Sequence, residues 1–183
     1  QNVGINRTRI GVIDILKSMG ADITLENEQQ FSGEPVADIR VKSSKLVGSV
    51  IDPNLVSLAI DEFPVLFVAA AFSKGKTTFS GIGELRVKES DRIAAMSEGL
   101  KKLGIMVDEY PDGAIIYGGE FSGGEVHSQG DHRIAMSLAI AGTIANEQVI
   151  VNDIDSVDTS FPGFCDCMAE IGADIQRIEA TQY

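Results

Sequence analysis

Two short segments of the sequence place basic side chains beside acidic ones, at positions where helices are expected to begin. Residues 85–93 read LRVKESDRI and residues 130–133 read GDHR. Ser90 or Asp91 can cap the helix that follows the first segment, and Asp131 can cap the helix that follows the second. An arginine, Arg92 or Arg133, falls in the first turn of each helix. The free N–H groups of a helix start attract anions, so both segments predict a binding site for phosphate or carboxylate groups.

A third arginine precedes a helix in the same way. Arg9 closes the segment NRTR at residues 6–9. Each of the three segments, taken singly, is also consistent with a solvated, charged turn. In a fold built of repeats, however, equivalent helix ends can lie on one rim, and arginines gathered there would bind anions through paired N–H donors.

Asp61 is the candidate for proton transfer. It follows the apolar residues LAI and precedes EFP at the expected start of a helix. One interpretation is a helix cap with a proline in the first turn. The other is a carboxylate that faces the rim and accepts a proton from a substrate hydroxyl. The two roles are compatible.

The remaining reactive residue types predict no further site. His127 stands alone in a polar loop and is expected at the surface. Cys165 and Cys167 are too few for a disulfide framework and too closely spaced for a usual metal or redox pair, so we expect them to pack in a helix. No segment has the ligand spacing of a structural metal site.

The elements that position these residues recur along the chain. An amphipathic helix, a glycine and a short apolar strand follow one another three times, with the glycines at positions 20, 104 and 172 and the last strand expected over 173–175. A second helix–strand pair occurs at 61–79 and again 70 residues later, at 131–149. The sequence therefore predicts an α/β fold of repeated βαβαββ units, two nearly whole and a third without its front part. We expect one domain over residues 1–183, with Gln1 inside a unit of a longer chain.

The composition excludes several classes of protein. The 183 residues carry 27 acidic and 15 basic side chains, a net charge of −12, whereas binders of nucleic acid or of anionic membranes need a basic surface. The longest apolar segment, 63–72, has about half the length needed to cross a bilayer. No signal sequence is visible and the two cysteines fit a reducing setting. We therefore expect a cytoplasmic protein with no nucleic-acid and no membrane partner.

Several motifs together are similar to those of a known family. LRVKESDRI at 85–93 and GDHRIAM at 130–136 resemble the two signature motifs of the EPSP synthase (3-phosphoshikimate 1-carboxyvinyltransferase) family, and DEFP at 61–64 and SFP at 160–162 extend the resemblance over nearly the whole chain. NRTR at 6–9 is similar to a signature of the glyphosate-tolerant branch. The resemblance implies the enolpyruvyl transferase fold, in which two domains of three βαβαββ units flank the active site. This chain resembles the C-terminal part of the family sequence, which makes up most of one of these domains.

The resemblance also implies a reaction. The enolpyruvyl group of phosphoenolpyruvate moves to the 5-hydroxyl of shikimate-3-phosphate through a tetrahedral intermediate, phosphate is released, and neither a cofactor nor a metal is needed. The other domain and a short N-terminal segment are absent from this chain, so the missing N-terminal half of the enzyme is the expected partner. We expect the isolated chain to bind substrates weakly and not to turn them over.

The positions that match the family's active-site residues receive their roles from this resemblance. Asp61 contacts the shikimate hydroxyls and is the candidate base for the 5-hydroxyl. Glu89 takes part in proton transfer at the methylene carbon of phosphoenolpyruvate, and Lys88 lies between the two substrates. The residues expected to bind phosphoenolpyruvate are Arg92 and Arg133, with His132 beside the second.

The sequence differs from the family pattern at two places, and two other hypotheses for its function remain. Many members carry a lysine just before the position of Phe161, where this chain has DTS, and Glu84 stands where some members have asparagine. The sibling UDP-N-acetylglucosamine enolpyruvyl transferase shares the fold but lacks the KESDR run. A non-catalytic binding module of the same fold is the third hypothesis, and the joint retention of the residues above argues against it.

Overall fold

The computed structural model describes residues 1–178 and shows the expected mixture of helices and strands. The helices are α1 (Gly11–Ser18), α2 (Phe63–Phe72), α3 (Arg92–Lys102), α4 (His132–Gly142), α5 (Val157–Ser160) and α6 (Phe164–Glu170). The strands are β1 (Val3–Gly4), β2 (Asp22–Phe31), β3 (Glu34–Lys42), β4 (Lys76–Ser80), β5 (Val107–Tyr110), β6 (Gly113–Tyr117), β7 (Gly124–His127) and β8 (Val149–Asn152). Short 3₁₀ helices lie at Pro53–Leu55 and Gly83–Val87.

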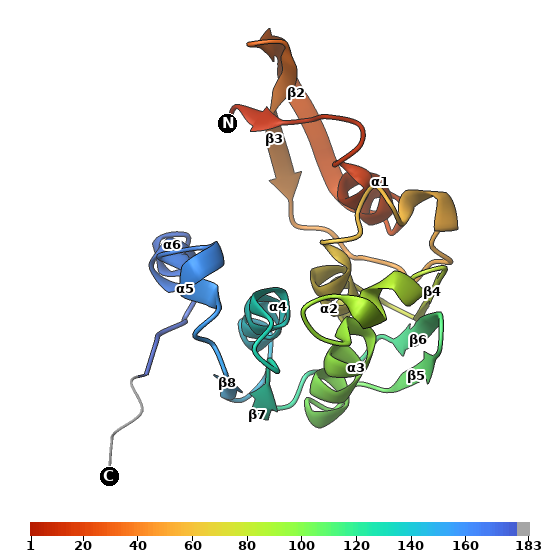
Figure 1. The fold of residues 1–183 in the computed structure, drawn as a ribbon, viewed down its shortest axis with the longest axis vertical. Helices are drawn as coiled ribbons and strands as arrows, with labels where there is room; N and C mark the ends of the chain where they lie inside the picture. The colour runs from red at the N-terminus through yellow and green to blue at the C-terminus, as the bar shows by residue number, and fades with distance from the viewer. Residues whose placement is uncertain (179–183) are drawn as a thin grey trace.

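In the described part of the chain the strands form three sheets, which follow the repeat. Strands β1, β3 and β2 are antiparallel neighbours in that order, and so are β4, β6 and β5, whereas β7 and β8 are a parallel pair. Val47 forms a parallel bridge to Lys74, just before β4, and Val50 forms one to Thr78 of β4, so that residues 47–117 make one complete βαβαββ unit. In Figure 1 the long β2–β3 hairpin projects at the top, and the last unit, with β7, β8 and α4 to α6, lies on the left.

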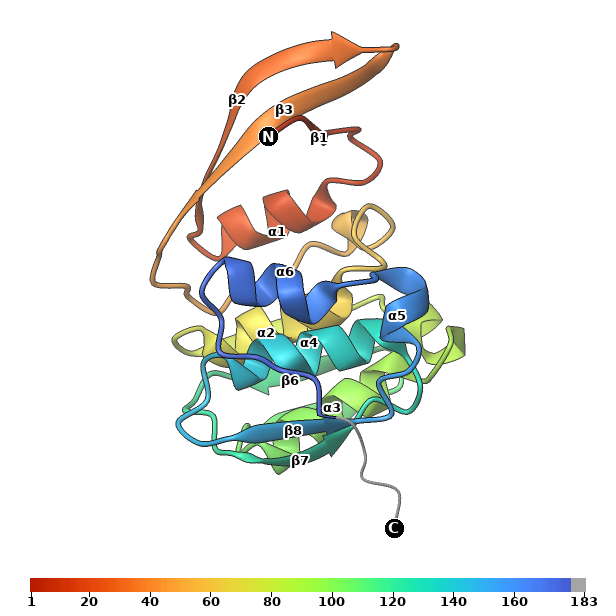
Figure 2. The same cartoon turned by 90° about the vertical axis from the view of Figure 1, so that its left-hand side faces the viewer.

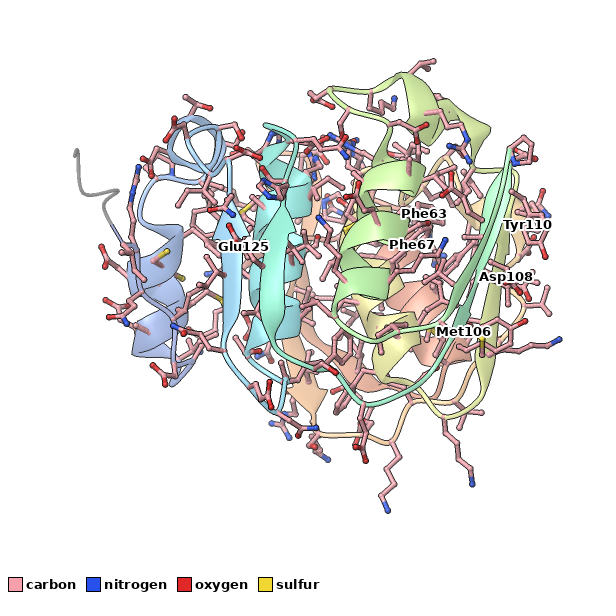
Figure 3. The ribbon with its side chains drawn as sticks, turned by 90° about the horizontal axis from the view of Figure 1, so that it is seen from below. Phe63, Phe67, Met106, Asp108, Tyr110 and Glu125 are labelled. Carbon is pink, nitrogen blue, oxygen red and sulfur yellow. The ribbon has the colours of Figure 1, made fainter. Side chains whose placement is uncertain are left out.

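Helices α2, α3 and α4 pack against one another at the centre of the molecule (Figures 1 and 2). Helix α2 has no polar face because it also contacts α1 and β6, which leaves little of its surface to water. The rings of Phe63 and Phe67 pack on Phe79 of β4, with centroids 5.8 and 4.9 Å away. Figure 3 shows Phe63 and Phe67 in the interior, with Asp108 and Tyr110 along the edge strand β5. This core fixes the helix starts that carry the charged residues.

The pattern of helix, glycine and strand is confirmed for the first two units and only in part for the third. Gly20, Gly104 and Gly172 have φ values of +93°, +86° and +95° after their helices, a conformation that glycine adopts without strain. Strands β2 and β5 begin shortly after the first two glycines. The strand expected over 173–175 is wrong: residues 173–178 have no regular structure. A strand needs a hydrogen-bonded neighbour, and no described strand pairs with this segment.

The longest apolar segment of the sequence is α2, which has 10 residues. It lies in the protein core rather than at a surface. Across residues 1–178, no helix combines the length and the apolar character that crossing a bilayer requires.

Candidate active site

The entrance to α2 brings three arginines to one carboxylate. Oδ1 of Asp61 lies 3.5 Å from Nη1 of Arg92. Oδ2 lies 3.4 Å from Nη2 of Arg133 and 3.9 Å from Nη1 of Arg9. Arg92 and Arg133 stand in the first turns of α3 and α4, and Arg9 stands in the turn before α1. Helix starts from three units therefore meet at one rim, which is the arrangement that the repeat predicted.

Asp61 does not cap the helix that it precedes. Glu62 occupies the N-cap position of α2, and no side chain caps this helix. Pro64 lies in the first turn and has no N–H, so the helix start has one unpaired donor fewer to satisfy. The first interpretation of Asp61 is thus wrong. Its carboxylate faces the arginines instead, and its backbone carbonyl accepts a hydrogen bond of 3.2 Å from Nη1 of Arg133.

Arg92 is the buried centre of this cluster, with 1% of its surface exposed. Its Nε donates to Oδ2 of Asp131 over 2.8 Å, and its Nη2 donates to Oε2 of Glu89 over 2.5 Å. Asp131 is itself buried, and its Oδ1 accepts the backbone N–H of Arg133 over 2.8 Å, so it caps α4 as expected. Buried charges are tolerated when they are paired, and Asp131 therefore ties Arg92 to the start of α4.

One terminal nitrogen of Arg92 has an ion-pair contact but, within residues 1–178, no hydrogen bond. Its Nη1 is buried, has no hydrogen-bond partner among the described residues, and lies 3.5 Å from Oδ1 of Asp61. Buried donors are nearly always satisfied in folded proteins. Among the described residues, the carboxylate of Asp61 is therefore the acceptor that faces this N–H group.

Two carboxyl groups at this rim have pKa values shifted in opposite directions. Burial works to raise the pKa of Asp131, but hydrogen bonds from Arg92, from the backbone of Arg133 and from Ser90 outweigh burial, and this pKa is lowered. Burial also raises the pKa of Glu62, and the nearby charge of Arg133 offsets this only in part. Asp131 is thus held as an anion, whereas Glu62 takes up a proton more readily than an ordinary glutamate.

Glu62 is a residue of this rim that the sequence did not single out. With Asp61 and Arg133 it lines a small hollow of about 160 Å³ between α2 and α4. The only sequence signal for Glu62 is its place in the segment DEFP, next to Asp61. Nothing in a single sequence distinguishes a half-buried glutamate from a solvated one at such a helix entrance.

Replacing Glu62 by glutamine is expected to stabilise the chain slightly near neutral pH. The pKa of Glu62 is raised in the folded protein above 4.5, its value in the unfolded chain. The resulting contribution to the free energy of unfolding is therefore fully present below pH 4.5 and is lost as the pH rises through the folded pKa. The variant should therefore have a higher melting temperature than the parent at pH 7 and the same melting temperature at pH 4. Thermal unfolding at both pH values measures this. Glu28→Gln, at an exposed position of β2, is the control, and an equal difference at both pH values would contradict the prediction.

Not every residue that the sequence singled out contacts Asp61. Nζ of Lys88 is paired with Oε1 of Glu84 over 2.5 Å, so the residue that departs from the family pattern is the partner of this lysine. His132 is half-buried beside Arg133 and makes no side-chain hydrogen bond among the described residues. Arg86, the third cation of LRVKESDRI, holds the β5–β6 turn by donating to two of its backbone carbonyls.

The histidine and cysteines outside this rim behave largely as expected. His127 is exposed, and its Nδ1 lies 3.1 Å from Oδ2 of Asp153. Cys165 is half-buried in α6. Cys167 is exposed, so the expectation that both cysteines pack in a helix is wrong for this one, because α6 turns that face outward.

The sequence of this chain is similar to sequences of known function. A family model for EPSP synthase (3-phosphoshikimate 1-carboxyvinyltransferase) matches residues 1–168. The 3-phosphoshikimate 1-carboxyvinyltransferase of Alkalilimnicola ehrlichii is 54% identical over 181 residues, which cover 98% of this chain and 41% of the relative. The protein of the same name from Nitrosococcus oceani is 53% identical over 177 residues, with 97% and 40% covered.

Solved structures agree with this assignment. An EPSP synthase from Acinetobacter baumannii superposes with a TM-score of 0.92 at 49% identity, covering 95% of this chain and 41% of that one. The enolpyruvyl transferase NikO from Streptomyces tendae superposes with a TM-score of 0.62 at 16% identity, which shows a shared fold alone. The chain spans about two fifths of the length of its EPSP synthase relatives. Since the family model matches nearly the whole sequence, the chain belongs to the EPSP synthase family.

Proposed function

We propose that this chain takes part in the transfer of the enolpyruvyl group from phosphoenolpyruvate to the 5-hydroxyl of shikimate-3-phosphate. The observation that carries the proposal is the contact of Asp61 with guanidinium groups from three helix starts. Both substrates are anions, and a site for them needs several cations next to a group that accepts a proton. The three arginines that gather beside Asp61, in a chain whose net charge is −12, supply these cations.

The proposed roles follow the chemistry of addition and elimination. In the addition, the 5-hydroxyl oxygen attacks carbon 2 of phosphoenolpyruvate, Asp61 accepts the hydroxyl proton, and Glu89 delivers a proton to carbon 3. In the elimination, Glu89 takes a proton back from carbon 3, the bond between carbon 2 and the phosphate oxygen breaks, and phosphate leaves. Arg92 and Arg133, with Lys88 and His132 nearby, bind the phosphate and carboxylate groups. The salt bridge of Glu89 to Arg92 supports a position of this carboxyl at the same site.

The proposal includes a second part of the enzyme. The relatives are more than twice as long as this chain, and we infer that residues 1–183 form most of one of two domains, in a cytoplasmic enzyme. The other domain would supply further substrate contacts, so the chain alone is expected to bind weakly and not to turn over substrate. The last five residues of this range lie outside the described part of the chain.

A full-length chimera tests the proposal. In it, this chain replaces the matching part of the Alkalilimnicola ehrlichii enzyme, to which it is 54% identical. Phosphate release from phosphoenolpyruvate that depends on shikimate-3-phosphate is the expected result. A folded chimera without this activity would favour the non-catalytic module, and activity with UDP-N-acetylglucosamine instead would favour the sibling enzyme.

We also propose that the chain comes from the glyphosate-tolerant branch of the family. The segment NRTR at residues 6–9 supports this assignment. A titration of the chimera with glyphosate, beside the parent enzyme, tests how much of any tolerance this chain carries.

Phosphate and phosphoenolpyruvate are each expected to raise the melting temperature of this chain, and Arg133→Ala is expected to abolish the effect. The guanidinium of Arg133 is one third exposed beside Asp61, so it can donate to an anion at the rim. An anion at ten times its Kd adds about 1.4 kcal/mol to the free energy of unfolding, which corresponds to a shift of a few degrees.

Scanning fluorimetry at constant ionic strength measures this protection, with chloride in place of the test anion as the reference. Arg40→Ala is the matched control because it removes an arginine from the β2–β3 hairpin, where its partner is Glu26. Protection of Arg133→Ala equal to that of the parent would mean that the anion binds elsewhere.

A further inference from the structure

The segment before α1 forms a turn that its own side chains hold in place. Oδ1 of Asn6 accepts hydrogen bonds from the backbone N–H of Thr8 over 3.1 Å and from the Thr8 hydroxyl over 2.9 Å. The backbone N–H of Arg9 donates to the carbonyl of Asn6 over 2.8 Å and closes the turn. Asparagine and threonine are common in turns because their side chains bond the nearby backbone in this way. The backbone position from which the Arg9 side chain extends is therefore fixed by this turn.

This turn is also fixed relative to Asp61. The backbone N–H of Gly11 donates to the carbonyl of Leu58 over 3.1 Å, three residues before Asp61. The two backbones touch so closely that a Cβ at position 11 would lie 2.8 Å from Cβ of Leu58. Glycine is thus required at the contact that brings the start of α1 to the entrance of α2.

The guanidinium of Arg9 differs from the other two at this carboxylate. Arg92 is buried and donates to Asp131 and Glu89. Arg133 donates to the carbonyl of Asp61. The side chain of Arg9 is 73% exposed and makes no hydrogen bond with the described residues, and its ion pair with Asp61 is long, at 3.9 Å. Its N–H donors are therefore available at the rim, beside the carboxylate of Asp61 that Arg92 also contacts.

We propose that Arg9 is a substrate-binding residue of this site and donates paired hydrogen bonds to a phosphate or carboxylate group of a substrate bound beside Asp61. A planar guanidinium binds such groups through two parallel N–H···O contacts. Asn6 and Thr8 act as positioning residues for it. The inference rests on the proposed function, because it assigns Arg9 to the substrates of that reaction.

The competing explanation is a surface ion pair, in which Arg9 only balances the charge of Asp61. Exposed pairs of this kind contribute little free energy. In that case removal of Arg9 would change kcat through the contact with Asp61 and leave the KM values of both substrates unchanged. If Arg9 binds substrate, its removal should instead raise the KM of one substrate and leave kcat nearly unchanged.

The test compares Arg9→Gln with Arg7→Gln in the full-length chimera. Arg7 is the matched control because it is exposed in the same turn and has no ion pair among the described residues. Arg9→Gln is expected to raise the KM of one substrate roughly tenfold or more, the effect of losing charge-assisted hydrogen bonds. Separate titrations of phosphoenolpyruvate and shikimate-3-phosphate show which one Arg9 binds. Arg9→Lys should recover part of the affinity, and Asn6→Ala should raise the same KM by a smaller factor.

Equal KM values for Arg9→Gln and Arg7→Gln would overturn the inference. If the unmodified chimera forms no product, the proposed function fails first, and protection of this chain against heat by inorganic phosphate or phosphoenolpyruvate then decides the role of Arg9. Protection lost in Arg9→Gln and kept in Arg7→Gln would support an anion-binding arginine. Protection kept in both variants would rule it out.

Discussion

Replacement of Asp131 by alanine is expected to lower the free energy of unfolding of this chain by about 3–5 kcal/mol, the cost of breaking a buried ion pair. The carboxylate is buried and accepts hydrogen bonds from Nε of Arg92 and from the hydroxyl of Ser90. It also caps α4 through the backbone N–H of Arg133. Without it, the guanidinium of Arg92, which is 1% exposed, loses its buried counter-charge. Urea unfolding of parent and variant measures the loss.

Two further variants separate the buried charge from the helix cap. Asp91→Ala removes the cap of α3 together with a partly exposed ion pair to Arg86, and should cost about 1–2 kcal/mol, the sum of an ordinary cap and such a pair. The double variant Asp131→Ala/Arg92→Met removes both members of the buried pair and should be more stable than Asp131→Ala alone. If the double variant is less stable than Asp131→Ala, the loss of stability in Asp131→Ala comes from the missing helix cap and not from the unpaired charge of Arg92.

The pH dependence gives an independent check on Asp131. Its pKa is lowered in the folded protein, so its contribution to stability is present above the unfolded value of 3.8 and is lost as the pH falls toward the folded value. The difference in stability between parent and Asp131→Ala should therefore shrink in acid. A constant difference between pH 7 and pH 3 would contradict a charge-based role.

Local signals explain how much of the fold could be predicted. A glycine after an amphipathic helix marks a left-handed residue wherever it occurs, and Gly20 and Gly104 were placed correctly for this reason. The strand expected after Gly172 shows the limit of such signals. Its apolar alternation is as good as that of the other two, but a strand forms only against a neighbour, and pairing over long distances is not written in the local pattern.

The same limit applies to the site. Repeat spacing relates Arg9 to Arg92, whose helices both end at a glycine, but Arg133 begins the helix that is equivalent to α2, so its place beside the other two comes from the packing of α4 on α2. Repeat spacing could not separate Arg92 from Arg86, two arginines six positions apart in one motif. Arg86 is bound by carbonyls of the β5–β6 turn, more than twenty residues further along the chain, whereas Arg92 is buried against Asp131. Only the packing of α3 on α4 makes that distinction.

In the full-length chimera, Asp61→Asn is expected to lower kcat by about 100- to 10,000-fold, the range for loss of a general base. Asparagine has the shape of aspartate but accepts no proton from a hydroxyl group. The substitution also removes the negative charge from among three guanidinium groups, which lie 3.4 to 3.9 Å from it. The positive potential at the rim then rises, so anionic substrates should bind as tightly as before or more tightly.

A lower kcat together with an unchanged or higher affinity for the anionic substrates distinguishes a general base from a residue that only positions the arginines. If Asp61 served mainly to align Arg9, Arg92 and Arg133, its loss would weaken anion binding together with kcat. Steady-state assays measure the change in kcat, and a separate titration of phosphoenolpyruvate measures the change in its affinity. Asp52→Asn, at an exposed cap of the Pro53–Leu55 turn, controls for loss of one carboxylate in the same unit. Because Arg92 is also held by Asp131 and Glu89, the arginine cluster should outlast the loss of Asp61, which favours the first outcome.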